Sequence, residues 1–215
     1  MNEEDPMKYL MSSIVDGDKA AAIESARRLL DRGLPAYDIV INGCSRAMKR
    51  VGKLYEEGEY YIPEILMAAK AFEGVMEVVR PFLKEGEVRA SGTVIMGVCE
   101  GDIHSLGKNI VILMLEAAGF DVIDLGVDVP ASKFVDAAVE KNADLIGVSA
   151  LMTSSMLRIK DVIALAREKG VRAKIMIGGG PVTQEYAHQV GADGYGEDAV
   201  AAVRMAVELT KSGER

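Results

Sequence analysis

The chain has 215 residues, of which 49% are hydrophobic, so one or two compact domains with a substantial core are expected. Its formal net charge is −8, and this acidic balance argues against nucleic acid or an anionic membrane as the main partner. No apolar run approaches the ~18 residues needed to cross a bilayer, and the acidic first residues do not resemble a secretory signal. We therefore expect a cytoplasmic protein. Cys44 and Cys99 lie on apolar segments and form no CxxC pair, so both are interpreted as core residues.

Up to about residue 85 the sequence has the periodicity of amphipathic helices. A short helix is expected over Pro6–Ile14. A second follows, with Asp16 or Asp18 as its cap, and stops at Gly33, because glycine is common just past a helix end.

Two further helices open at prolines. The third begins at Pro35, and its apolar residues recur at spacings of four and three: Val40, Cys44, Ala47, Val51 and Leu54. The fourth begins at Pro63, and its apolar face comprises Ile62, Ile65, Ala69, Phe72, Met76 and Val79. Four amphipathic helices with short connections predict a small four-helix bundle.

A polar segment with two glycines, residues 84–92, predicts a domain boundary, giving a helical domain over 1–88 and a second domain over 89–215. After it the pattern alternates between short apolar runs and helical stretches. The apolar runs cover residues 93–98, 120–125, 144–150 and 173–179, with a weak fifth at 193–196. This alternation predicts an α/β domain of the flavodoxin-like, doubly wound type with a five-stranded parallel sheet. In such sheets ligands bind beyond the carboxyl ends of the strands.

The loop after the first predicted strand carries the strongest chemical signal. Asp102 and His104 are two residues apart, so in an extended segment their side chains point to the same side. A carboxylate that accepts the N–H of an imidazole fixes its tautomer, which suits a metal ligand or a general base. From spacing alone, a polar loop in which Asp102 caps the next helix remains an equal alternative. Gly107-Lys108-Asn109 is not a phosphate-binding P-loop, because Asn109 stands where a Ser or Thr would hold magnesium.

Two other strand ends carry polar or glycine-rich turns. The third strand ends in hydroxyl residues, which cap a helix or hydrogen-bond a polar ligand: Ser149, Thr153, Ser154 and Ser155. The fourth ends in Gly178-Gly179-Gly180, which indicates either a tight turn or a close approach of the backbone to something large. Because all three loops fall at the ligand-binding end of the predicted sheet, a single binding site is favoured.

These residues resemble a known family. Asp102 to Gly107 match the DxHxxG motif of the cobalamin (B12)-binding domain, Ser149 to Leu151 match its SxL element, and Gly178-Gly179 match its GG element. The helical first half resembles the cap of methionine synthase and of the corrinoid proteins of methanol, methylamine and aryl-ether demethylation, and the resemblance spans nearly the whole chain. It implies a cobalamin or related corrinoid bound base-off and His-on, with His104 as the cobalt ligand.

The resemblance also implies roles for the surrounding residues. Asp102 would hold His104, and Ser155 would continue that relay. The motif loop itself would contact the cofactor through Gly101, Asp102, Ile103, His104, Ser105, Leu106 and Gly107. The slot for the nucleotide tail would be lined by Ser149, Leu151, Thr153, Gly178, Gly179, Gly180, Tyr195 and Gly196. Residues of the cap would cover the upper face of the corrin: Tyr61, Ile65 and Met67.

The implied function is that of a methyl carrier. Cobalt in the +1 state would accept a methyl group from a substrate-specific methyltransferase, and methyl-Co(III) would donate it to a second methyltransferase with a thiol or tetrahydropterin acceptor. A reductive activase is a further candidate partner; nucleic acid and membranes are not. The chain is expected to show no turnover alone, so its status as an enzyme stays open.

Three alternatives remain. A cobalamin-dependent sensor normally adds a DNA-binding domain, for which this acidic chain has no spare segment. The small subunit of an adenosylcobalamin mutase usually lacks the helical cap. A cofactor-free flavodoxin-like interaction protein would bind no corrinoid at all, which an absorption spectrum of the purified chain would reveal.

Overall fold

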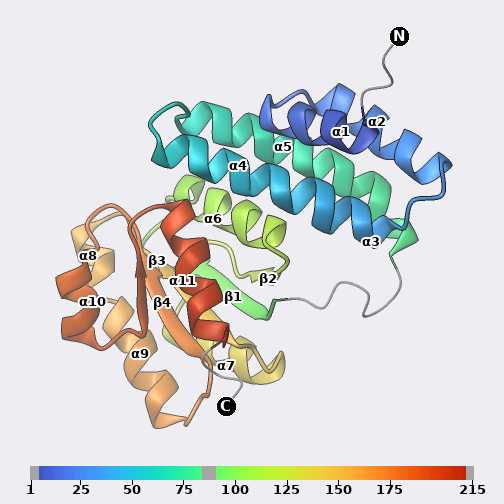
Figure 1. Cartoon of the computed structure of the whole chain (residues 1–215). Helices are drawn as coiled ribbons and strands as arrows, with labels where there is room; N and C mark the ends of the chain where they lie inside the picture. The colour runs from blue at the N-terminus through green and yellow to red at the C-terminus, as the bar shows by residue number, and fades with distance from the viewer. Residues whose placement is uncertain (1–4, 84–90, 212–215) are drawn as a thin grey trace. The chain divides into compact units, whose positions relative to one another are not determined.

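The computed structural model describes residues 5–83 and 91–211 of the chain (Figure 1). Its contacts divide the chain into two compact units, Met1–Arg89 and Ala90–Arg215. The boundary predicted at residues 84–92 falls mainly on residues 84–90, which lie outside the described residues. Within the described ranges, no helix is long and apolar enough to span a membrane.

The first unit is a bundle of helices, as predicted. Its elements are α1 (Pro6–Val15), α2 (Lys19–Asp31), α3 (Ala36–Asp38), a π-helical segment η1 (Ile39–Cys44), α4 (Ser45–Glu56), α5 (Ile62–Val79) and a final 3-10 turn η2 (Arg80–Phe82). Of the two predicted caps for α2, Asp18 is the one used, because its Oδ1 accepts a hydrogen bond from Ala21 N at 3.0 Å. At the start of α5, Glu64 Oε2 accepts a hydrogen bond from Tyr61 N at 2.9 Å.

The third predicted helix is interrupted by η1, which its apolar pattern does not indicate. The predicted face is buried throughout: Val40, Cys44, Ala47, Val51 and Leu54. Gly43 lies in the π-helical segment, and a Cβ there would come within 2.8 Å of Leu10 Cδ2, so α1 packs directly on this backbone. On α5 the prediction for Ile62 was wrong: it is exposed because it lies in the first turn, and the buried face begins at Ile65.

The second unit contains a five-stranded parallel sheet in the order β2-β1-β3-β4-β5. The strands are β1 (Thr93–Val98), β2 (Asp121–Asp124), β3 (Leu145–Ser149), β4 (Lys174–Gly178) and β5 (Gly194–Gly196). The helices are α6 (Leu106–Ala117), α7 (Ala131–Glu140), α8 (Thr153–Met156), α9 (Ile159–Glu168), α10 (Gln184–Val190) and α11 (Ala199–Lys211). The predicted fold class, a helical N-terminal domain followed by a flavodoxin-like α/β domain, is confirmed.

Alternate strand residues pack against opposite layers of helices. Ile95, Ile146 and Ile175 belong to the core beneath α7 and α9, and their neighbours along the strands, such as Val94 and Leu145, belong to the core beneath α6 and α11. Because helices cover both faces of the sheet, a ligand can reach it only at the ends of the strands. The strand order reverses between β1 and β3, which places the expected ligand crevice at the carboxyl ends of these two strands.

Candidate functional site

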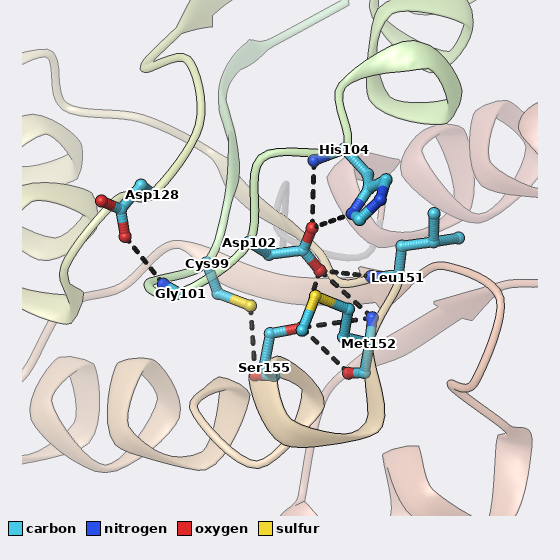
Figure 2. Close-up of polar contacts among 8 residues, drawn as sticks. All are labelled: Cys99, Gly101, Asp102, His104, Asp128, Leu151, Met152 and Ser155. Carbon is cyan, nitrogen blue, oxygen red and sulfur yellow. Dashed lines mark hydrogen bonds and ion pairs between the residues drawn. The ribbon is translucent and has the colours of Figure 1, made fainter.

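The segment that joins β1 to α6 turns sharply at the carboxyl end of the sheet (Figure 2). Cys99 extends β1, and its N–H donates to Ser149 O at 3.0 Å. Gly101 then has φ +84, a left-handed conformation that favours glycine. As a result Asp102 turns inward and is fully buried, while the His104 side chain remains about half exposed, at 49%.

The Asp102 carboxylate is the centre of the hydrogen-bond network. Oδ1 accepts from His104 N at 3.0 Å and lies 2.8 Å from His104 Nδ1. Oδ2 accepts from Leu151 N at 2.7 Å, from Met152 N at 3.2 Å and from Ser155 Oγ at 2.7 Å. Asp102 does not cap α6, whose N-cap residue is Ser105, so the alternative role considered for this aspartate is absent.

These contacts determine the protonation state of the site. Burial by itself would raise the pKa of Asp102, but the hydrogen bonds from Ser155, Leu151 and His104 outweigh it and hold that pKa below its usual range. The carboxylate is therefore ionised and can only accept hydrogen bonds. It accordingly favours the His104 tautomer with a proton on Nδ1, which leaves the Nε2 lone pair, on the opposite side of the ring, available to a ligand or metal.

Large apolar side chains from the residues next to this histidine and from the loop that contacts Asp102 are exposed. Ile103 is 73% exposed, Leu106 63% and Leu151 50%. They come from the motif loop, the first turn of α6 and the loop after β3, and Leu151 also donates its backbone N–H to Asp102. Exposed apolar groups clustered around a polar anchor are typical of a ligand surface.

The ends of β3, β4 and β5 lie in register beside this loop. Ser149 pairs with Gly178, and Gly178 pairs with Gly196. Thr153 is exposed at the start of α8, Gly180 is exposed after β4, and Tyr195 is partly buried on β5. Ser155, by contrast, is buried under Asp102.

The glycines at the end of β4 are required by the protein itself. Gly179 has φ +117, and a Cβ there would lie 1.9 Å from Ala150 O; a Cβ on Gly178 would lie 2.8 Å from Gly196 O. The close approach predicted for this turn is therefore an approach to neighbouring strand ends. Gly107 differs, because no atom lies within 4 Å of the place where its Cβ would be.

Besides the backbone donors to Asp102, sequence reasoning missed two contacts of charged side chains. Lys108, whose side chain is buried, places Nζ 2.6 Å from Asp124 Oδ2 at the end of β2, so the lysine of the rejected P-loop match forms an ion pair. Asp128 lies in the loop after β2, and its Oδ1 accepts from Gly101 N at 2.7 Å. No local signal could have revealed either pair, because the partners are 16 and 27 residues apart and belong to no motif.

In the first unit, the predicted cap residues differ in exposure. Tyr61 and Met67 are exposed at 66% and 52%, and Ile65 is buried. A Cβ on Gly17 would lie 2.6 Å from Met67 Cβ, so Met67 packs against the turn between α1 and α2. Their predicted role over the corrin stays a prediction.

Two family models match the chain, both described as B12 binding domain, over residues 92–204 and residues 8–80. The chain belongs to the B12-binding corrinoid proteins. This corrinoid protein is 41% identical over 215 residues to dimethylamine corrinoid protein 1 of Methanosarcina acetivorans, covering 97% of this chain and 99% of that one. It is 40% identical to trimethylamine corrinoid protein 1 of the same organism, covering 94% and 95%.

Solved structures agree. The corrinoid protein superposes with a TM-score of 0.87 and 30% identity on a chain of the methanol:cobalamin methyltransferase complex of Methanosarcina barkeri, covering 97% of this chain and 81% of that one. With the monomethylamine corrinoid protein of M. barkeri the TM-score is 0.54 and the identity 39%, over 93% and 95% of the two chains. The resemblance inferred from the motifs is confirmed, and the chain acts as a methyl carrier in a methyltransferase system.

The described residues fit a corrinoid. A half-exposed imidazole with one nitrogen fixed by a buried carboxylate is a suitable cobalt ligand, and the apolar side chains of Ile103, Leu106 and Leu151 offer contact area to a large macrocycle.

Proposed function

We propose that this corrinoid protein binds its cofactor with the lower base displaced and with His104 Nε2 on the cobalt. The observation that carries the proposal is the 2.8 Å contact between His104 Nδ1 and the buried Asp102 carboxylate. It orients the ring and keeps the proton on Nδ1, so that the Nε2 lone pair is free to face a metal. When bound, the corrinoid supplies a cobalt that accepts and releases a methyl group.

The residues below His104 stabilise that orientation. The ionised Asp102 stabilises the Nδ1–H tautomer, and it is itself held by Leu151 N, Met152 N and the Ser155 hydroxyl. In this proposal the Ser155 hydroxyl, which donates a hydrogen bond to the carboxylate, continues the relay from His104. The orientation of His104 thus depends on two loops, one after β1 and one after β3, which are joined by the Asp102 carboxylate.

The displaced nucleotide tail is proposed to lie along the ends of β3, β4 and β5. Ser149 and Thr153 can hydrogen-bond its polar groups, and Tyr195 can pack against its base. The remaining predicted contacts are Gly178, Gly179, Gly180 and Gly196, among which Gly178 and Gly179 also serve the fold. Gly101, Ser105 and Gly107 are proposed to approach the corrin beside His104.

The partners are proposed to be methyltransferases. One similar chain comes from a methanol:cobalamin methyltransferase complex, which supports docking of this chain to a substrate-specific methyltransferase. A second methyltransferase, with a thiol or tetrahydropterin acceptor, would remove the methyl group, and a reductive activase would restore the cofactor. The similarity to dimethylamine and trimethylamine corrinoid proteins favours a methylated amine as the donor.

The ligation is tested by paramagnetic resonance of the Co(II) protein. The chain has two histidines, so labelling with nitrogen-15 histidine reports on His104 and His188 alone. We expect nitrogen hyperfine splitting that changes with the isotope, persists in His188→Gln and disappears in His104→Ala. Loading the protein with cobinamide, which has no nucleotide base, ensures that no nitrogen of the cofactor's own tail can be the lower ligand. A splitting that ignores the isotope, or survives in His104→Ala, would contradict the proposal.

A further inference from the structure

Asp128 holds the loop that carries His104, although it lies on a different segment. Its Oδ1 accepts a hydrogen bond from Gly101 N at 2.7 Å (Figure 2). Its own N–H donates to Asp102 O at 2.9 Å. One of these hydrogen bonds is made to the backbone of Gly101 and the other to the backbone of Asp102. Asp128 therefore fixes the two residues of backbone that immediately precede the Ile103-His104 turn.

The backbone of Asp128 is unusual. Its φ is +53, and only one other non-glycine residue among those the structure describes, Asn142 at +47, has a positive φ. Aspartate and asparagine tolerate this conformation better than other side chains, and glycine tolerates it best. Glycine, however, would leave Gly101 N without the carboxylate. Position 128 thus needs both the left-handed backbone and an acceptor side chain.

The segment around Asp128 is itself anchored to β1. Val98 N donates to Gly126 O at 3.0 Å, and Val129 N donates to Val98 O at 3.0 Å. Asp128 is exposed, so its carboxylate does not belong to the buried network around Asp102. Its influence on His104 has to pass through the backbone of Gly101 and Asp102.

We propose that Asp128 is a positioning residue that sets the orientation of His104 toward the corrinoid cobalt, through the Gly101–Asp102 backbone. The inference rests on the proposed His104 ligation. The Nδ1–Oδ1 contact of 2.8 Å depends on where the Asp102 backbone lies, because the buried carboxylate has no freedom to compensate. Loss of the Asp128 side chain should therefore reduce the fraction of Co(II) protein in which His104 is bound.

Three variants of the full chain test this. Asp128→Gly keeps the positive φ and removes the acceptor, and Asp128→Asn keeps both. Asn142→Gly is the matched control, because it also replaces a positive-φ residue and removes an acceptor, here for Arg172 Nη2 at 3.0 Å. Asn142 precedes β3 and thus lies near the amino ends of the strands, whereas the site is at their carboxyl ends. Each protein is loaded with cobinamide, reduced to Co(II) and examined by paramagnetic resonance, while circular dichroism checks that it is folded.

We expect Asp128→Gly to lower the ratio of His-bound to His-free cobalt by about tenfold, the lower end of the range for residues that support a metal ligand. Asp128→Asn should restore the wild-type ratio, and Asn142→Gly should not change it. Without cofactor, the Gly101 amide resonance should move upfield in Asp128→Gly and stay near its place in Asp128→Asn.

Two results would overturn the inference: a wild-type ratio in Asp128→Gly, or an equal loss in Asn142→Gly, which would indicate general loosening. Failure of the proposed function itself is distinguishable, because the wild-type protein would then show no histidine hyperfine splitting.

Discussion

At the scale of single residues, Asp102 joins the two loops of the site. Its two oxygens accept from three backbone amides and the Ser155 hydroxyl and also contact the His104 ring. An asparagine at this position has one acceptor oxygen and presents two N–H donors of its own to these same groups. The carboxylate is thus needed before any ligand is bound.

We therefore expect Asp102→Asn to lower the free energy of unfolding of the cofactor-free chain by about 2–4 kcal/mol. Urea unfolding at pH 7 measures this. Asp136→Asn is the control, because Asp136 is exposed and its ion pair with Lys169 should contribute about 1 kcal/mol or less. Equal stability of Asp102→Asn and wild type would show that the network adds nothing to the fold.

The buried Cys44 thiol makes the free energy of unfolding depend on pH. Burial raises the pKa of the Cys44 thiol to about 12, whereas a thiol in the unfolded chain titrates near pH ~8.5. The folded state thus holds this proton more tightly, so the stabilisation is fully present below the unfolded pKa and is lost as the pH rises toward the folded one. We expect the stability advantage of wild type over Cys44→Ala to shrink by up to about 1.4 kcal/mol per pH unit above ~9.

Unfolding curves of both proteins at pH 7, 8 and 10 measure this advantage. It should be constant between pH 7 and 8 and smaller at pH 10. An advantage that stays constant to pH 10 would mean that the thiol ionises as easily in the folded chain as in the unfolded one.

At the scale of elements, the glycines of the predicted cofactor site are of two kinds. Gly179 is confined by Ala150 O and has a positive φ, so alanine there meets both a backbone clash and a strained conformation. Gly107 is in the first turn of α6 with open space around it, where alanine is the better helix former.

Gly179→Ala is therefore expected to cost about 3–5 kcal/mol of stability, and Gly107→Ala to be neutral or to add up to about 1 kcal/mol. Thermal unfolding of the cofactor-free proteins distinguishes them. A corrinoid titration then adds a second measurement: if the macrocycle approaches position 107, Gly107→Ala binds it more weakly despite its stable fold. A well-folded, stable Gly179→Ala would contradict the packing argument.

At the scale of the whole molecule, the chain is a carrier. Its two units match B12-binding models over residues 8–80 and 92–204, which together span most of the chain. We expect no multiple turnover from the purified holoprotein with methylated amines and a thiol acceptor. Turnover should begin when a cognate substrate-specific methyltransferase and an acceptor methyltransferase are added, measured as the methylated thiol formed. Sustained turnover by the chain alone would contradict this division of labour.

The sequence by itself determined the fold class and singled out His104 as the candidate cobalt ligand. Strand and helix periodicities fixed the two kinds of unit, because burial on one or both faces imposes the spacing of apolar residues. The Asp102–His104 pair was visible because both partners lie in one short motif. The run of glycines also marked the turn at Gly179 after β4, although it did not show that Ala150 O occupies the space of the absent side chain.

Only the tertiary structure decided which distant groups meet at that motif. Leu151 N and Met152 N reach Asp102 because β1 and β3 are neighbours in the sheet, and Asp128 reaches Gly101 because β2 lies on the other side of β1. The family resemblance had already implied the contact of Ser155 with Asp102. A backbone amide is the same in every sequence, so its role as a donor leaves no residue pattern. The left-handed turn at Asp128 contacts the backbone of Gly101 and Asp102, and the π-helical segment at Gly43 packs against the Leu10 side chain; no local periodicity encodes either contact.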